Sequence, residues 1–230
     1  KVYMAESRED PDIKFAVKIL HTRKLEAPVL AQMQQELKIL YKLDHPYICN
    51  YIESFEDDKH IYIVMEYCQG KDLMSRLEEK GHYTELEAAR MIFKIIEGLN
   101  HIHNVHVVHR DLKPENIIID DAGDPKIIDF GLSSDTLGGT KALKTYVGSK
   151  VYMAPEILEN TGHSSTCDMW SIGIILYLLL SGQFPFSLRN LEHEISHSPV
   201  CFPPHKWENI SLVCKHFILK LLDKCRDRRI

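Results

Sequence analysis

The chain has 230 residues, of which 44% are hydrophobic and 27% charged, a composition that is ordinary for a folded globular protein. This length suits one large domain or two unequal lobes with enough apolar material for a buried core. The formal net charge of -5 gives no electrostatic reason to expect binding to nucleic acid or to an anionic membrane.

The six cysteines are scattered and form no CxxC pair, which indicates buried free thiols in a reducing compartment. The opening stretch "KVYMAESRED" is charged and lacks the apolar core of a secretory signal. The longest apolar run, "WSIGIILYLLLSG", is too short to span a bilayer and predicts a helix buried on all sides. We therefore expect a protein without a membrane span, located in the cytoplasm with access to the nucleus.

Residues 1–66 have the pattern of a small strand-rich lobe. The segments "KFAVKIL" (14–20) and "HIYIVMEY" (60–67) carry β-branched and aromatic residues in short runs and predict strands. Between them, apolar residues recur at helical spacing and predict one amphipathic helix; these residues are Leu30, Met33, Leu37, Leu40 and Leu43.

Residues 67–230 have the pattern of a larger, mainly helical lobe, which follows a hinge near residues 66–70. Thr84 and Glu87 form the signature of a capping box and predict the start of a long helix. Two short strands, "NIIID" and "PKIID", are predicted to be joined by a turn at "DAGD". Residues 129–156 show little periodicity and predict a functional loop. The expected fold class is α+β, with two lobes.

Four histidines within "NHIHNVHVVHRDLKPEN" pose a question of function, because they could form a metal site or serve the structure. His101 and His103 are two residues apart, so they face different sides of a helix, unlike the i, i+4 pair of a helical metal site. Imidazole groups also suit the negative end of a helix dipole. The spacing therefore favours structural roles over a zinc site.

The motifs "HRDLKPEN" (109–116), "DFG" (129–131) and "APE" (154–156) occur in this order, and "AVKIL" places Lys18 on a predicted strand. This ordered set resembles the signature of protein kinases. "DMWSIG" (168–173) and Arg229 also resemble kinase landmarks, so the resemblance covers essentially the whole chain. "DLKPEN" is similar to the serine/threonine pattern rather than that of tyrosine kinases, and the APE motif disfavours a small-molecule kinase.

The resemblance implies an ATP-dependent serine/threonine kinase that uses Mg2+ and acts on proteins. Asp111 would orient the substrate hydroxyl, and Lys113 would stabilise charge on the transferring phosphate. Asn116 and Asp129 would supply the oxygen ligands of the metal. The resemblance also implies that Lys18 holds the nucleotide phosphates and is oriented by an ion pair with Glu36 on the helix that follows. Glu26 and Glu53 lie on either side of Glu36 in the sequence, and its register against the neighbouring motifs selects Glu36.

The resemblance implies further roles by register. Val2, Ala16 and Ile118 would enclose the adenine ring, with Met65 at the back of the pocket. Glu66 and Cys68 would offer backbone hydrogen bonds from the hinge. Asp72 and Glu115 would face the peptide on the side N-terminal to its acceptor, where two carboxylates favour Lys or Arg. The alternative is that Asp72 only caps its helix and Glu115 only contacts the ribose.

Three structural or regulatory sets follow in the same way. Leu40, Tyr51, His109 and Phe130 would stack as an apolar spine anchored by Asp168. Glu156 and Arg229 would form a buried ion pair. A phosphate on Thr145 would pair with Arg110.

The sequence departs from the kinase pattern at both ends. The glycine-rich loop that approaches the phosphates would precede Lys1, and a last helix would follow "RDRRI", so we expect a fragment of a longer chain. "CDMWSIGIILYLLLSGQFPF" resembles the calcium/calmodulin-regulated group, and in particular calcium-dependent kinases with a fused calcium-binding region. No loop fits D-x-[DN]-x-[DN]-G-x5-E, so any calcium sensor would lie outside this chain. The rival hypothesis is a pseudokinase that binds nucleotide or acts as a scaffold, which the missing glycine loop favours.

Overall fold

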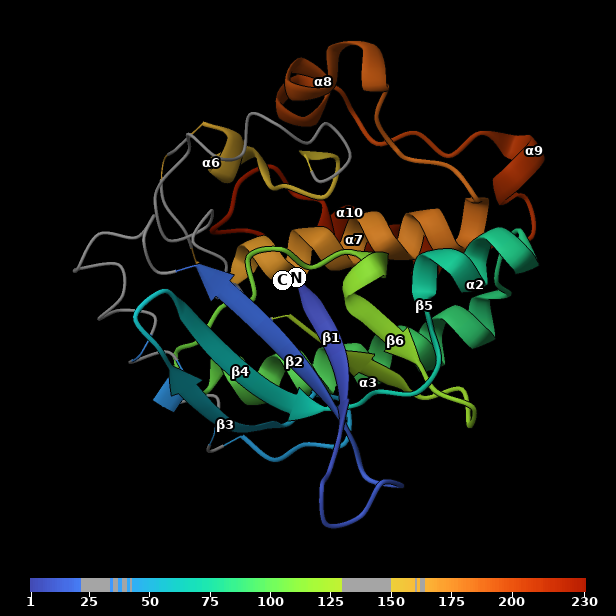
Figure 1. The fold of residues 1–230 in the computed structure, drawn as a ribbon. Helices are drawn as coiled ribbons and strands as arrows, with labels where there is room; N and C mark the ends of the chain where they lie inside the picture. Colours follow the sequence, from blue (N-terminus) through green and yellow to red (C-terminus); the bar gives the residue numbers. More distant parts are fainter. Residues whose placement is uncertain are drawn as a thin grey trace.

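The first lobe contains a four-stranded antiparallel sheet with the strand order β1-β2-β4-β3 (Figure 1). Its strands are β1 (Val2–Glu6), β2 (Lys14–His21), β3 (Tyr51–Glu56) and β4 (His60–Glu66). β2 includes the predicted run 14–20, and β4 covers residues 60–66 of the predicted run 60–67. The computed structural model describes residues 1–21, 34, 37–38, 41, 43–129, 150–159, 161 and 164–230.

The predicted helix between β2 and β3 lies mostly outside the described residues. Within it, Gln34, Leu37 and Lys38 are helical, and Leu37 is buried in the core. Glu36 and Leu40, to which the sequence assigns roles in the ion pair and the spine, lie outside the described residues.

The second lobe begins with a three-stranded sheet and two helices. The sheet has the order β5-β6-β7, with strands β5 (Lys71–Asp72), β6 (Ile117–Ile119) and β7 (Pro125–Ile127). Gly123 has a φ of 85° in the turn between β6 and β7, where a residue with a side chain would be strained. Helix α2 spans Leu73–Lys80 and helix α3 spans Glu85–His103. The capping box at Thr84 and Glu87 is present in both directions, as the sequence predicts.

A helix that is apolar on every side forms the centre of this lobe. It is α7 (Thr166–Ser181), in which 14 of 16 residues are buried, so the prediction of an all-round buried helix is confirmed. The Cβ of any larger residue at Gly173 would come within 2.7 Å of Leu222, so glycine permits close packing near α10 (Leu212–Leu221). The remaining helices of the described part are α6 (Pro155–Leu158), α8 (Leu191–His197) and α9 (Pro204–Trp207), with short 3-10 turns at η2 (Pro114–Asn116) and η4 (Leu188–Asn190).

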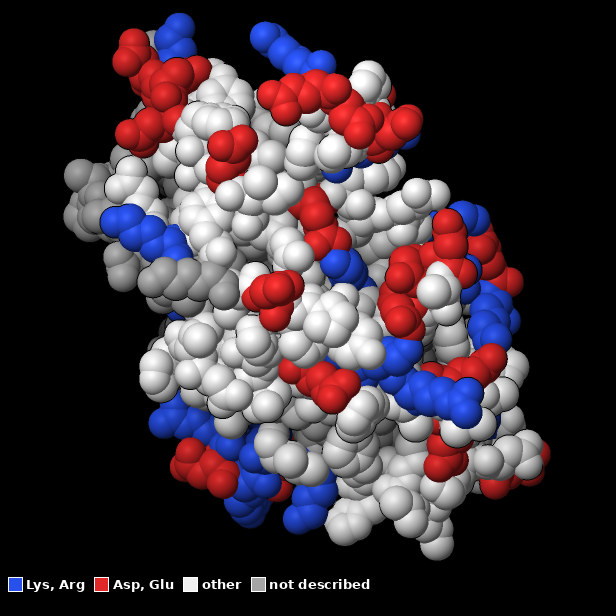
Figure 2. Space-filling view, turned by 90° about the horizontal axis from the view of Figure 1, so that it is seen from below, with Lys and Arg blue, Asp and Glu red and all other residues white. Residues whose placement is uncertain are grey.

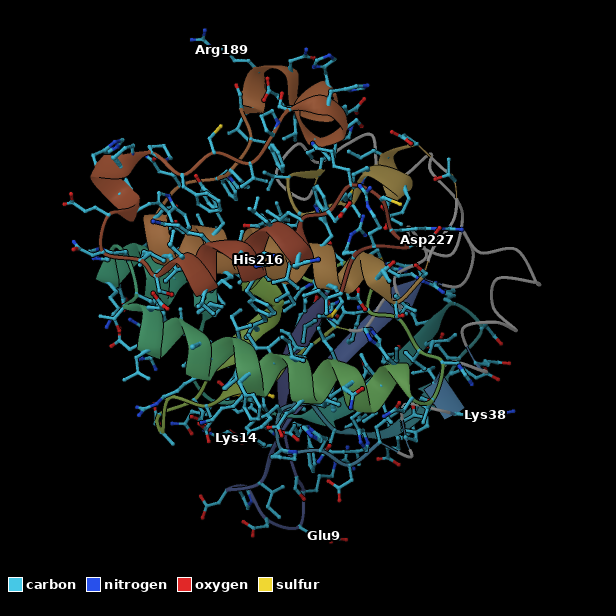
Figure 3. The ribbon with its side chains drawn as sticks, turned by 180° about the vertical axis from the view of Figure 1, so that it is seen from behind. Glu9, Lys14, Lys38, Arg189, His216 and Asp227 are labelled. Atoms are coloured by element: carbon cyan, nitrogen blue, oxygen red, sulfur yellow. The ribbon has the colours of Figure 1, made fainter. Side chains whose placement is uncertain are left out.

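The two lobes are joined by main-chain hydrogen bonds as well as by the chain itself. The N–H of Cys49 donates to the carbonyl of Ile127 at 2.8 Å, and the N–H of Ile127 donates to Tyr47 at 2.9 Å. Figure 3 shows Glu9 of the β1–β2 turn and Arg189 of the second lobe at opposite ends of the molecule. The segment that precedes β3 therefore fixes the first sheet to the second one.

The charged side chains can be followed on one face of the molecule. On the face drawn in Figure 2, Lys and Arg side chains are interspersed with Asp and Glu rather than gathered in one patch. Among the described residues no helix is both long and apolar enough to cross a membrane.

The prediction of buried cysteines is only partly right. All six thiols are free, but only Cys49 and Cys167 are buried, whereas Cys201 and Cys225 are exposed. Both exposed thiols lie outside regular secondary structure, in segments that flank α9 and follow α10. The hydrophobic character of cysteine predicts burial, but residue type alone does not reveal that these two positions belong to surface loops.

Candidate active site

A cleft between the lobes is lined by all six residues that the resemblance places around the adenine ring and at the hinge. It has a volume of about 160 Å3. The predicted residues in its lining are Val2, Ala16, Met65, Glu66, Cys68 and Ile118, and Asp129 lines it as well. Sequence reasoning missed Cys49, Tyr67 and Ile128. Cys49 and Ile128 reach the cleft through the pairing of residues 47–49 with Ile127, for which the sequence carries no local signal.

Of the two hinge residues predicted to offer backbone hydrogen bonds, Glu66 has its N–H engaged, whereas the backbone groups of Cys68 are available. The N–H of Glu66 donates to the carbonyl of Asn50 at 2.9 Å, and the Glu66 carboxylate pairs with Lys126. Within the described part of the chain, Cys68 makes no backbone hydrogen bond, so its N–H and C=O are available to a ligand. A hydrogen bond to Cys68, together with burial, raises the pKa of the Cys49 thiol, which therefore stays protonated beside the cleft.

Lys18 and Asp129 meet across 111 positions of sequence and form an ion pair. Lys18 lies on β2 and is only 8% exposed. A buried ammonium group requires such a partner, because the loss of its hydration is costly. Asp129 has a φ of 64°, a left-handed conformation that is uncommon for residues other than glycine and frequent at functional sites.

The catalytic-loop residues form one hydrogen-bonded group. The Nζ of Lys113 lies 2.6 Å from the Asp111 carboxylate, and the Nδ2 of Asn116 donates to the backbone carbonyl of Asp111 at 2.7 Å. The N–H of Ile128, next to Asp129, donates to the carbonyl of Asn116 at 2.9 Å. Asp111 and Asn116 are thus held next to the segment that carries Asp129.

A buried carboxylate on α7 holds the start of this loop. Asp168 is 1% exposed and accepts hydrogen bonds from the N–H groups of His109 and Arg110, each at 2.9 Å. The Nε2 of His103 lies 2.8 Å from the same carboxylate. Three donors on one buried carboxylate fix the backbone just before Asp111.

These contacts answer the question about the histidines. His103 contacts Asp168, and the Nε2 of His109 lies 2.9 Å from the carbonyl of Ile128. The ring of His101 packs on that of His45 with centroids 5.1 Å apart. Each of these three histidines has a structural partner. The signal that sequence reasoning missed is the partnership of His103 with Asp168, because the two residues lie 65 positions apart.

A second buried charge pair ties the end of the chain to α6. Arg229 forms two parallel hydrogen bonds with the Glu156 carboxylate, with Nη2 and Oε2 2.9 Å apart, and its guanidinium lies 5.1 Å from the ring centre of Trp170. Both side chains are almost completely buried. The structure thus brings together the pair that the sequence predicts.

Asp72 and Glu115 do not line the cleft. Both carboxylate oxygens of Asp72 accept hydrogen bonds from Ser75, at 2.9 Å from the backbone nitrogen and 2.6 Å from the hydroxyl, so Asp72 caps α2. Glu115 is exposed and follows Pro114 in η2. Tyr51 and His109, the two described residues of the predicted spine, are buried, whereas Phe130 and Thr145 lie outside the described residues.

A β-rich lobe and a helical lobe enclose a cleft in which a buried lysine meets an aspartate beside an Asp-Lys-Asn group. This arrangement defines the class of ATP-dependent protein kinases, and comparison with known proteins agrees with it. The family model described as "Protein kinase domain" matches residues 1–230. The chain belongs to the protein kinase family.

The chain is also similar to individual protein kinases. The chain is 36% identical over 227 residues to myosin light chain kinase A of Dictyostelium discoideum, a match that covers 96% of this chain and 76% of the relative. It is 37% identical over 228 residues to calcium/calmodulin-dependent protein kinase type 1 of Macrobrachium nipponense, covering 96% and 65%. A crystal structure of Rad53 1-466 in complex with AMP-PNP is similar, with a TM-score of 0.81, 34% identity, and coverage of 99% of this chain and 58% of that one. The chain thus spans between 58% and 76% of the length of these relatives.

Proposed function

We propose that this domain transfers the γ-phosphate of ATP to serine and threonine hydroxyls of proteins, with Mg2+ held by Asn116 and Asp129. The observation that carries the proposal is that three separate parts of the chain meet beside one cleft. Lys18 of β2 pairs with Asp129, which lines the cleft, and the loop that carries Asp111 and Asn116 is hydrogen-bonded to the residue before Asp129. Phosphoryl transfer needs a cation for the phosphates, oxygen ligands for a metal and a carboxylate for the acceptor. The four side chains provide these three things.

The donor set fits magnesium. The Nδ2 of Asn116 is committed to the Asp111 carbonyl, so its Oδ1 is the atom able to bind a metal. The carboxylate of Asp129 is the second hard oxygen donor, and hard oxygen ligands in small number suit Mg2+. A metal held by Asn116 and Asp129 would supply positive charge that offsets the negative charge of the phosphates.

The remaining polar groups divide the work of transfer. Lys18, now paired with Asp129, would contact the nucleotide phosphates, and the Cys68 backbone would position the adenine ring. Asp111 would accept a hydrogen bond from the acceptor hydroxyl and orient it for attack. Lys113, which contacts Asp111 at 2.6 Å, would place its positive charge beside the transferring phosphate.

Two carboxylates, Asp72 and Glu115, are predicted to select a basic residue in the substrate, and Glu115 is the better candidate. It is exposed, and its charge adds to the effect of burial in raising the pKa of Tyr152, a residue of the segment that follows Lys150. Lys150 itself is paired with Glu192 on α8 at 2.7 Å. Asp72, by contrast, is engaged by Ser75, so it contributes less to recognition of Lys or Arg before the acceptor.

The relatives suggest how the activity is regulated. Two of them are named for myosin light chain kinase and for calcium/calmodulin dependence. We propose that calcium controls this kinase through calmodulin or a calcium-binding segment outside these residues, because the sequence has no calcium-binding loop pattern. The free thiols support a location in the cytoplasm or nucleus.

The test is transfer of labelled phosphate from ATP to a library of short peptides by the full-length protein, with and without Mg2+. We expect Mg2+-dependent labelling of serine and threonine peptides and enrichment of Lys or Arg before the acceptor. In the variant Glu115→Gln, kcat/KM for the basic peptides should fall several-fold, because a charge contact contributes about 1–3 kcal/mol. The matched control is Glu208→Gln, an exposed glutamate near α9, which should leave kcat/KM unchanged.

The outcomes separate the hypotheses. Absence of transfer to any peptide by a folded, nucleotide-binding protein would support the pseudokinase alternative. Transfer without a preference for basic residues would contradict the role of Glu115 and leave the kinase assignment intact.

A further inference from the structure

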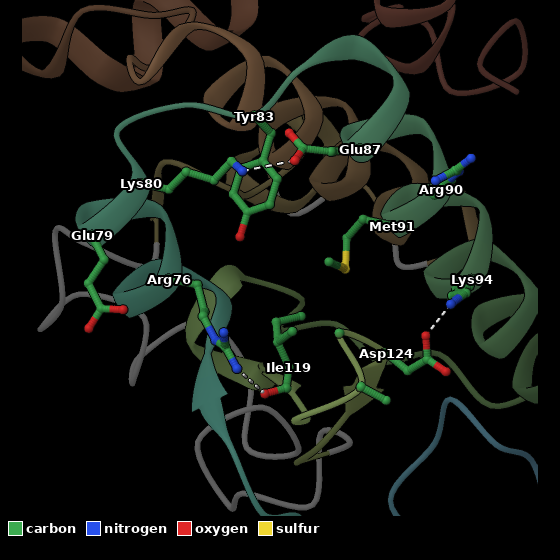
Figure 4. A pocket seen from close by; sticks show the side chains of 12 residues that line it. Arg76, Glu79, Lys80, Tyr83, Glu87, Arg90, Met91, Lys94, Ile119 and Asp124 are labelled. Atoms are coloured by element: carbon green, nitrogen blue, oxygen red, sulfur yellow. Dashed lines mark hydrogen bonds and ion pairs between the residues drawn. The ribbon is translucent and has the colours of Figure 1, made fainter.

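A hollow separate from the nucleotide cleft lies in the second lobe, between α2, the first half of α3 and the β6–β7 turn (Figure 4). Its volume is about 540 Å3, more than three times that of the nucleotide cleft at about 160 Å3. None of the residues that line it lines the cleft. A volume in this range is typical of a ligand site, and the proposed transfer reaction makes no use of it.

The floor of the hollow is apolar. Tyr83, Met91 and Ile119 are buried core residues, and Figure 4 shows their side chains directed toward the space between the helices and the turn. Arg76 lies beside Ile119 on the wall formed by α2. An apolar floor of this kind suits an apolar side chain of a ligand more than it suits a hydrated ion.

The acidic residues that line the hollow are already paired. Lys80 pairs with Glu87 at 2.9 Å, Lys94 pairs with Asp124, and Glu79 pairs with Lys71. Hydrogen bonds from Lys80 and Thr84 lower the pKa of Glu87 to about 2, so this carboxylate remains ionised and bound at neutral pH. The positive charges of the three lysines therefore neutralise the negative charges of the three carboxylates.

Two arginines of the lining are left without a carboxylate partner within the described part of the chain. Arg76 donates from Nη2 to the carbonyls of Ile119 and Asp120 at 3.4 and 3.3 Å, and its Nε is buried with no hydrogen-bond partner. Arg90 is exposed and makes no ion pair. Figure 4 shows the two arginines on opposite sides of the hollow. Its unsatisfied charge is thus positive and divided between two walls.

We propose that this hollow is a docking site for an acidic segment of a partner protein, in which two carboxylates flank one apolar residue. The apolar side chain would contact Met91 and Ile119, while one carboxylate would bind Arg76 and the other Arg90. Guanidinium groups bind carboxylates through paired hydrogen bonds, and charge complementarity selects the partner. The inference goes beyond the proposed function, because binding here requires no phosphoryl transfer.

The test is fluorescence anisotropy with the full-length protein and a labelled probe peptide, Gly-Glu-Ala-Leu-Ala-Glu-Gly. The Arg90→Glu and Arg76→Gln variants should each weaken binding on the order of tenfold, because each removes one charge contact. Arg8→Glu, an exposed arginine in the β1–β2 turn, is the matched control and should leave the Kd unchanged. Thermal unfolding of each variant shows whether it is folded, and the exposed Arg90 gives a readout even where Arg76→Gln lowers stability.

Several outcomes would overturn the proposal. Equal binding of the peptide in which Lys replaces both Glu residues would contradict the charge argument, and equal binding of the Leu-to-Ser peptide would contradict the role of the floor. Complete competition by free glutamate at the peptide's concentration would identify a site for small anions only. The Arg90→Glu variant should phosphorylate a short substrate peptide at the wild-type rate. This assay tests the kinase assignment independently of binding at the hollow.

Discussion

The charged groups behind the catalytic loop differ from those at the cleft in burial and in number of partners. Asp168 is 1% exposed with three donors, and Arg229 and Glu156 are nearly inaccessible and paired twice. At the cleft, the side chains of Asp111 and Asp129 are 34% and 35% exposed. The first group contacts only the protein, whereas the second group is open to a ligand.

This difference separates charges that maintain the structure from charges that act on the substrate. A buried charge with all its hydrogen bonds made becomes costly when one partner is removed. A partly exposed charge can be solvated when its partner is removed, so its loss affects stability little. Substitutions in the first group should therefore lower the free energy of unfolding, and substitutions in the second should lower the rate of transfer.

The largest expected effect on stability comes from Arg229→Met, which leaves Glu156 buried without its partner. We expect the free energy of unfolding to fall by about 3–5 kcal/mol, measured by chemical denaturation. The double variant Arg229→Met with Glu156→Gln should recover part of this loss, because it removes the unpaired charge. The control is Arg228→Met, whose pair with Asp223 is 72% exposed on the arginine side, so that its loss should change the free energy of unfolding far less. An equal loss for both arginines would contradict the distinction between the two groups.

Asp168→Asn should have the next largest effect. The asparagine side chain offers one oxygen where Asp168 accepts from the N–H groups of His109 and Arg110 through two oxygens. One buried N–H would lose its acceptor, at a cost of about 1–3 kcal/mol, and the loop before Asp111 would be less well fixed. Denaturation and kcat should therefore both change. Asp58→Asn, in the exposed turn before β4, is the control, and a shift of similar size there would refute the interpretation.

A smaller effect is expected at the start of α3. Thr84→Ala removes the hydroxyl that accepts from the N–H of Glu87 at 3.3 Å. Loss of an N-cap costs about 1 kcal/mol, and the cap lies far from the transferred phosphate, so kcat should be unchanged. Thr84→Ser, which keeps the hydroxyl, should restore most of the stability. If the serine variant is as unstable as the alanine variant, the capping hydrogen bond does not account for the loss.

The smallest effect is a dependence on pH at the same cap. Hydrogen bonds from Lys80 and Thr84 lower the pKa of Glu87 to about 2 from an ordinary value of 4.5. A carboxyl whose folded pKa is lowered stabilises the fold above its unfolded pKa, and this contribution disappears as the pH falls from 4.5 toward 2. Between these pH values the wild type should lose more stability than Glu87→Gln. Parallel curves for the two proteins would show that Glu87 does not contribute.

The sequence predicts much of the site because the catalytic residues lie in short motifs. Asp111, Lys113 and Asn116 are within six positions of one another, so one loop carries their geometry. The strand around Lys18 and the buried helix α7 are also visible as local patterns, and each was confirmed. Local chemistry is sufficient where the partners are close in sequence.

Contacts between distant segments explain what sequence reasoning missed. Cys49 lines the cleft because residues 47–49 pair with Ile127, and His103 meets Asp168 across 65 positions. The hollow under α2 is formed by three elements, each of which has an ordinary amphipathic or turn pattern. At Asp72 the local sequence was ambiguous, because an aspartate before a helix can cap the helix or bind the substrate. Its hydrogen bonds with Ser75 favour capping.

The measurement that tests the central claim most directly is kcat together with the free energy of unfolding for Asp111→Asn. The account predicts that kcat falls by about 10² to 10⁴-fold, because the acceptor hydroxyl loses the carboxylate that orients it. It also predicts that ATP affinity is nearly unchanged and that stability changes much less than in Asp168→Asn, because Asp111 is partly exposed and water can replace its contacts. A variant that keeps more than about half of the wild-type kcat, or that unfolds as readily as Asp168→Asn, would contradict the account.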